Sequence, residues 1–133
     1  MKILVTTIII PKLSKWGYAL YPSIAVQNKL FPAHLGENFC NVYESILNQR
    51  IAAKKRGDMT MSDGFKLSLN SVYGKSNVKY SFLMDNKYTI KTTINGQLML
   101  TMLCESLVGW IDDIQILQVN TDGLTVKIKK SDL

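Results

Sequence analysis

Two helical patterns follow one another in the middle of the chain, with only a short break between them. From Asn38 onward, apolar residues recur at steps of three and four, the spacing of one face of an α-helix. This first stripe consists of Phe39, Val42, Tyr43, Ile46, Leu47 and Ile51. Gly57 and Asp58 end it, and a second stripe begins almost at once with Met61, Phe65, Leu69 and Val72. Two helices joined by so short a link pack antiparallel, so the sequence predicts a helical hairpin over residues 38–74.

The second helix also carries end signals. Thr60, with Asp63 three residues later, resembles a capping box at its start. Gly74 stands where a C-terminal glycine is expected. These signals bound the second helix at residues 60 and 74.

The N-terminal run Ile3–Ile10 favours a buried strand. Five of its eight residues are Ile or Val and two are Thr, residue types that are enriched in strands. The run is far shorter than a bilayer span. A secretory signal is the alternative, but Pro11 and Lys12 follow the run and no small-residue cleavage site does. We therefore expect a soluble, intracellular protein.

Further strands are predicted on both sides of the helical hairpin. Residues 16–24 read as a strand that breaks at Pro22, because proline cannot donate to a sheet ladder. Residues 24–36 read as irregular. After the hairpin, residues 80–83 and 88–93 alternate enough to form two short strands.

The C-terminal part predicts a helix followed by a β-hairpin. Asn95 and Gly96 are taken as the start of the helix, and the run Leu98–Trp110 is apolar on nearly every side, which predicts a buried helix. Residues 114–128 then form a β-hairpin with its turn at Asn120–Gly123. Its solvent side is marked by Lys127, Lys129 and Lys130. Together these elements predict one α+β domain.

Charge and cysteine content narrow the classes of function. Sixteen Lys and Arg against ten Asp and Glu give a net charge of +6, so nucleic acid or a nucleotide phosphate is a plausible partner. Cys40 and Cys104 stand far apart, and His34 is the one histidine. This set excludes a structural zinc site and a disulfide scaffold.

The residues Lys66, Asn70 and Tyr73 are spaced i, i+4 and i+7 on the second helix. This spacing projects all three from one face. A cation, an amide and a phenol on one stripe can hold phosphate, sugar and base. The alternative is a solvated polar face with no ligand.

Two shorter segments hold chemistry-bearing residues. Asp122 lies in the turn of the β-hairpin, where a rigid, exposed carboxylate suits a Mg²⁺ ligand, although Asn, Asp and Gly are also ordinary turn residues. Tyr21 precedes Pro22 at the end of the second predicted strand. Its alternative interpretation is a Tyr-Pro turn packed on the core.

In this order the three segments resemble motifs A, B and C of the family B DNA polymerases, most closely the phage-type members. The family's motif A reads D-x-x-S-L-Y-P-S-I, motif B reads K-x-x-x-N-S-x-Y-G, and motif C reads Y-x-D-T-D-S. The resemblance covers residues 16–129, and motif B matches at every defining position. It implies a polymerase palm, residues 1–37 and 75–133, in which an antiparallel sheet is backed by the buried helix, with a fingers hairpin, residues 38–74, projecting from the palm.

The resemblance also implies a role for each matching residue. Tyr21 resembles the steric gate, whose ring lies beneath the sugar and excludes a 2′-hydroxyl. Lys66 resembles the lysine that contacts the incoming triphosphate, and Asn70 and Tyr73 resemble the residues that line the nucleotide and nascent base-pair pocket. Asp122 resembles the second carboxylate of motif C, the principal metal ligand there.

Arg50 and Lys54 on the first helix fit the same scheme. Members of the family carry an Arg and a Lys four residues apart on this helix, facing the triphosphate. An i, i+4 pair shares a helix face, so both cations can reach one polyphosphate.

The chain also departs from the motifs at defining positions. Trp16 occupies the place of the motif A aspartate, and Ala19 replaces the serine. In motif C, Gln118, Asn120 and Gly123 replace the tyrosine, the first aspartate and the serine. Phosphoryl transfer by two metals needs at least two converging carboxylates, and indole cannot coordinate Mg²⁺.

Asp112 and Asp113 precede the β-hairpin. They are expected at the end of the hairpin away from its turn, and solvated. They are therefore not expected to replace the missing carboxylate.

The resemblance implies template-directed deoxynucleotide transfer in a complete enzyme. Its partners would be a deoxynucleoside triphosphate, primer–template DNA and Mg²⁺, in the cytoplasm of a bacterium or a phage-infected host cell. No exonuclease or thumb region is recognisable, so we expect a fragment or remnant that is inactive alone. Two alternatives remain: a non-catalytic module that holds nucleotides or nucleic acid through Arg50, Lys54 and Lys66, and a basic structural domain with chance motifs.

Overall fold

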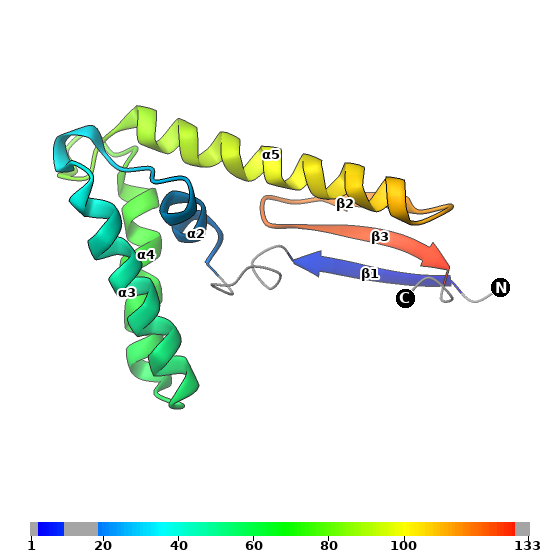
Figure 1. Ribbon diagram of the computed structural model, residues 1–133, viewed down its shortest axis with the longest axis horizontal. Helices are drawn as coiled ribbons and strands as arrows, with labels where there is room; N and C mark the ends of the chain where they lie inside the picture. The colour runs from blue at the N-terminus through cyan, green and yellow to red at the C-terminus, as the bar shows by residue number, and fades with distance from the viewer. Residues whose placement is uncertain (1–2, 10–18, 130–133) are drawn as a thin grey trace.

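The computed structural model describes residues 3–9 and 19–129. Its elements in order are β1 (Ile3–Ile9), α2 (Leu20–Gln27), the 3-10 helix η1 (Ala33–Leu35), α3 (Asn38–Lys55), α4 (Met59–Lys75), α5 (Asn86–Trp110), β2 (Gln115–Val119) and β3 (Gly123–Lys129). Figure 1 shows the sheet along the C-terminal half of α5, while α3 and α4 project from its other end with α2 in the angle. The predicted α+β class is confirmed.

The helices α3 and α4 confirm the predicted helical hairpin. Gly57 in the link has φ +80°, a left-handed conformation that glycine adopts without a Cβ penalty. Within the hairpin, the Tyr43 hydroxyl donates a hydrogen bond of 2.7 Å to the carbonyl of Leu69. Leu47 and Leu69 are fully buried. Apolar packing and this bond across the two helices hold the hairpin together.

The start of α4 differs from the predicted capping box. The N-cap is Asp58, whose carboxylate accepts a hydrogen bond of 3.0 Å from the Met61 N–H. The helix begins at Met59, so Thr60 lies inside its first turn. The prediction was wrong because Asp58 was assigned only to the end of the preceding helix, although aspartate is itself a strong N-cap residue.

The N-terminal half of α5 replaces the strand predicted at residues 88–93, and residues 80–83 form turns instead of the other predicted strand. The buried residues of α5 lie at four-residue steps, the spacing of a helix face and not of a strand: Tyr88, Thr92, Gly96 and Leu100. The Asp85 carboxylate caps the helix by accepting from the Tyr88 N–H at 3.0 Å. The hydroxyl of Thr92 bonds back to the carbonyl four residues earlier, at 2.8 Å, which satisfies that hydroxyl inside the helix.

The predicted buried helix at Leu98–Trp110 is the second half of α5, and it buries only one face. Leu100 is 6 % exposed, whereas Leu98 is 54 % and Met102 64 % exposed. The prediction of burial on nearly every side was wrong because the sheet covers a single side of the helix. The other face of α5 stays open in the described part of the chain.

The three described strands form an antiparallel sheet in the order β1-β3-β2. Ile3 pairs with Lys129 at one end of the β1–β3 ladder, and Val119 pairs with Leu124 beside the β2–β3 turn. The inner face of β3 packs on α5 through Leu124, Val126 and Ile128. The predicted β-hairpin and the helix-backed sheet are confirmed; β1 alternates between half-buried and exposed residues and is therefore not buried on both faces.

The strand predicted at residues 16–24 is a helix over its described part. In α2, Pro22 lies in the first turn, where a helix does not need the missing N–H. Ser23 donates a 2.6 Å hydrogen bond to the Ala19 carbonyl. Residues 16–18 lie outside the described residues, and residues 24–27, predicted to be irregular, continue α2.

A second core joins α2 to the helical hairpin and to the start of α5. Its buried members are Ala19, Ala25, Tyr43, Leu47, Leu69 and Tyr88. Because this core and the sheet core both contact α5, that helix holds the two parts of the molecule together.

Among residues 3–9 and 19–129, none of the helices combines the length and the apolar character of a membrane span.

Candidate functional site

Tyr21, taken from motif A, and Tyr73, taken from motif B, meet at the junction of α2, α4 and α5. The rings of Tyr21 on α2 and Tyr73 on α4 are stacked, with centroids 3.9 Å apart and planes 14° from parallel. The Tyr73 hydroxyl shares a 2.8 Å hydrogen bond with the Thr93 hydroxyl on α5. The stack therefore ties three helices together at the centre of the molecule.

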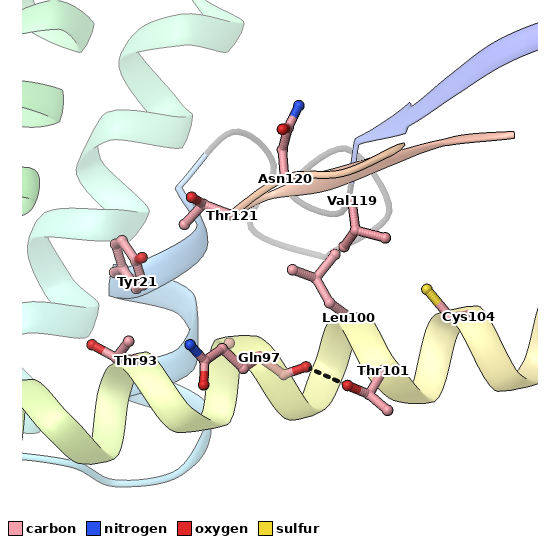
Figure 2. Close-up of a pocket in the computed structure, with 10 residues that line it drawn as sticks. Tyr21, Thr93, Gln97, Leu100, Thr101, Cys104, Val119, Asn120 and Thr121 are labelled. Carbon is pink, nitrogen blue, oxygen red and sulfur yellow. Dashed lines mark hydrogen bonds between the residues drawn. The ribbon is translucent and has the colours of Figure 1, made fainter. Parts of the chain in front are cut away.

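The turn of the β-hairpin faces the same place. Burial, with smaller contributions from Tyr73 and from the negative charge of Asp122, raises the pKa of Tyr21 to about 12. Figure 2 shows Asn120 and Thr121 of the turn close to Tyr21. Residues from the three motif segments thus surround one region.

A pocket of about 650 Å³ opens between α2, α5 and the hairpin turn (Figure 2). Its lining contains hydroxyl and amide groups, apolar side chains and no charged side chain. The lining residues are Tyr21, Thr93, Gly96, Gln97, Leu100, Thr101, Cys104, Val119, Asn120 and Thr121. Apolar walls with a few hydrogen-bonding groups suit an uncharged ligand group such as a base or sugar.

The lysine of motif B lies beyond the edge of this pocket. Lys66 and Asn70 are exposed on α4, and Tyr73 is half-buried. Lys66 precedes Tyr73 by seven residues, which is about 10 Å along a helix. Because residues at this spacing share a face, the cation lies on the same side of α4 as the stacked rings.

Arg50 does not lie on an open surface. It is 7 % exposed on the face of α3 that packs against α4. Burial lowers the pKa of its guanidinium, and the carboxylate of Asp63 on α4 opposes that shift. Lys54, one turn further along α3, is exposed. The structure brings Arg50 to α4 and leaves Lys54 at the surface, so the predicted phosphate contact of Arg50 stays a prediction.

The hairpin turn offers one carboxylate, which suits a single metal ion better than a pair of metal ions. Asp122 is exposed, and Asn120 beside it holds an amide oxygen that accepts a 3.1 Å hydrogen bond from Gln118. Over residues 3–9 and 19–129, no group of three or more His, Cys, Asp and Glu side chains could hold a metal. Mg²⁺ is often bound by one or two carboxylates together with substrate phosphates. Asp122 therefore fits a single Mg²⁺ that is also bound by phosphate, and a two-carboxylate centre does not fit the described donors.

The other acidic residues near the sheet lie at its far end. Asp113 is paired with Lys129, at the end of the β-hairpin opposite the turn. This position agrees with the expectation for Asp112 and Asp113. Trp16, at the place of the motif A aspartate, lies outside the described residues.

The side of the pocket that α5 provides was not predicted from the sequence. Thr93 lies in a segment that was predicted as a strand and Gln97 at the start of the predicted helix, and neither was considered as a site residue. Gly96 packs against α2, where an added Cβ would meet Ile24 Cδ1 at 3.4 Å and Tyr21 Cε1 at 3.7 Å. A glycine inside a helical pattern indicates such a close approach. The residues around Gly96 are buried at four-residue steps, which is the spacing of one helix face.

The chain matches no protein-family model, no curated protein and no solved structure.

Proposed function

We propose that this chain is a nucleotide-binding palm and fingers core related to the family B DNA polymerases. The observation that carries the proposal is the stack of Tyr21 on Tyr73 beside the hairpin turn that holds Asp122. The three residues come from segments far apart in the sequence. A chance set of motifs gives no reason for them to meet, whereas a shared ligand site does.

The distribution of charge supports a nucleoside triphosphate as the ligand. The pocket beside Tyr21 is lined by uncharged groups, which suit base and sugar. Lys66 lies on the same side of α4, about 10 Å from Tyr73 along the helix, and suits phosphates. An exposed Asp122 suits the Mg²⁺ that accompanies a triphosphate. The sugar and base bind near the tyrosines, and the phosphates extend toward Lys66 and Lys54.

In a complete enzyme this site would serve template-directed deoxynucleotide transfer to a primer 3′-hydroxyl on DNA, in the cytoplasm of a bacterium or phage-infected cell. The chain alone is proposed to bind without efficient transfer. Two-metal chemistry needs at least two carboxylates, and the turn offers Asp122 next to an amide, Asn120. This single carboxylate favours the second candidate function, a non-catalytic module that retains nucleotide binding.

Calorimetric titration of the chain with a deoxynucleoside triphosphate and Mg²⁺ tests the proposal. Micromolar binding is expected, weakened about tenfold or more in Lys66→Ala, because one charge-assisted hydrogen bond is lost. Lys79→Ala is the matched control, since Lys79 is exposed and lies outside α4. Absence of binding, or equal weakening in both variants, contradicts the proposal.

A primer-extension assay separates the two candidate functions. Binding without extension supports the non-catalytic module. Mg²⁺-dependent extension that is abolished in Asp122→Ala supports an active polymerase.

A further inference from the structure

The outer face of α5 is apolar at its middle. Ile94, Leu98 and Met102 follow one another at four-residue steps and are 47 %, 54 % and 64 % exposed. The opposite face of the helix is buried against the sheet and α2, at Leu100 and Gly96. Figure 1 shows the sheet and α2 on one side of α5. These three large apolar side chains are neighbours on the helix, so they form one contiguous exposed apolar patch. Such patches often mark an interaction surface, unlike apolar residues that are scattered singly.

Charged residues flank this apolar centre symmetrically. Lys91 lies seven residues before Leu98, and Glu105 lies seven residues after it; both are exposed. Because seven residues are almost two full turns, the three lie nearly on one line along the helix. The cation and the carboxylate are each about 10 Å from Leu98, on opposite sides of it.

This symmetry makes the face complementary to itself in one orientation. If two copies of α5 pack antiparallel with Leu98 against Leu98, Lys91 of each copy meets Glu105 of the other. Ile94 of each copy then meets Met102 of the other. A two-fold contact repeats each pair twice. A parallel arrangement would set lysine against lysine and glutamate against glutamate, which is repulsive.

We propose that two copies of this chain associate through the outer faces of α5, antiparallel and centred on Leu98. The buried area is that of one helix pair, at the small end of specific interfaces, so a dimer with a micromolar dissociation constant is expected. The lysine and glutamate contribute mainly to orientation. The association is independent of the proposed nucleotide site.

Sedimentation equilibrium of the whole chain and its charge variants tests this dimer. The unaltered chain is expected to dimerise, and Lys91→Glu and Glu105→Lys each to weaken the dimer about tenfold or more, because two attractive pairs become repulsive. Lys79→Glu repeats the charge change of Lys91→Glu at a position outside α5, and it is expected to leave the dimer unchanged.

Mixing the two charge variants gives the sharpest readout. A Lys91→Glu chain carries two carboxylates on this face and a Glu105→Lys chain carries two cations, so the two are complementary in the heterodimer and repulsive in either homodimer. The mixture is therefore expected to regain the dimer that each variant has lost. A monomeric unaltered chain at about 100 µM, well above a micromolar dissociation constant, overturns the proposal. A dimer that ignores both substitutions, or a mixture that stays monomeric, also overturns it.

Discussion

Gly96 on α5 sets the distance between that helix and the tyrosine of the pocket, so Gly96→Val is expected to destabilise the fold. A Cβ at this position would lie 3.4 Å from Ile24 Cδ1 and 3.7 Å from Tyr21 Cε1. Alanine therefore fits in ordinary contact and gains helix propensity of about 1 kcal/mol over glycine. Valine adds two methyl groups beyond that contact, and one of them must displace Ile24 or the Tyr21 ring.

The expected cost of Gly96→Val is about 1–3 kcal/mol in the free energy of unfolding, the usual range for overpacking a tight site. Gly64→Val on α4 is the matched control, because nothing lies within 4 Å of a Cβ there; its change is expected within about 0.5 kcal/mol. Urea unfolding followed by far-ultraviolet circular dichroism gives both values. If Gly96→Val proves as stable as Gly64→Val, the close packing of α5 on Tyr21 is wrong.

Three further predictions concern single residues. Asp58→Ala removes the N-cap of α4 and is expected to lower the free energy of unfolding by about 1 kcal/mol in the same urea assay; no change would show that the cap contributes nothing. Hydrogen bonds from the backbone N–H groups of Ala33 and Tyr88 lower the pKa of Asp85, so its contribution to stability is present above the ordinary aspartate pKa and is lost as pH falls through the lower folded value. Asp85→Asn is expected to flatten the acid limb of the stability–pH curve, and an unaltered limb contradicts this linkage. Tyr21→Ala is expected to bring the affinities for ribo- and deoxyribonucleoside triphosphates closer together, measured by calorimetry; an unchanged ratio removes the steric-gate role.

The parts of the fold that could be predicted are those whose local pattern agrees with their packing. The stripes of α3 and α4 face each other across a glycine link, and the β-hairpin has alternating residues with a turn of Asn, Asp and Gly. In these elements periodicity, turn chemistry and burial all favour the same structure. The predicted boundaries of these elements consequently lie within a few residues of the observed ones.

Neither the first half of α5 nor helix α2 could be predicted from local preference. Thr89, Thr92 and Thr93 are β-branched and favour strands, yet here their hydroxyls bond to carbonyls one turn earlier. Burial at Tyr88 and Gly96 against other helices outweighs that preference, because tertiary packing routinely overrides propensity. In α2, a proline that was read as a strand end occupies a first helical turn.

The motif residues of the candidate site were named from the sequence, whereas the residues of α5 that line its pocket were not. Tyr21 and Tyr73 were identified from resemblance, and their stacking follows from the meeting of α2 and α4, which no local pattern encodes. The expectation that Arg50 and Lys54 both reach one polyphosphate did not anticipate that Arg50 is buried beside Leu47 and Ala53. An arginine can bury its stem beside such apolar residues, and spacing alone does not separate that position from an exposed one.

The most direct test of the shared site is the amide spectrum of isotopically labelled chain during titration with a deoxynucleoside triphosphate and Mg²⁺. The account predicts saturable shifts around Tyr21, around Lys66 and Tyr73, and around Asp122, all with one dissociation constant. Shifts confined to one of these segments, or segments that saturate at different concentrations, would contradict a single site formed by all three.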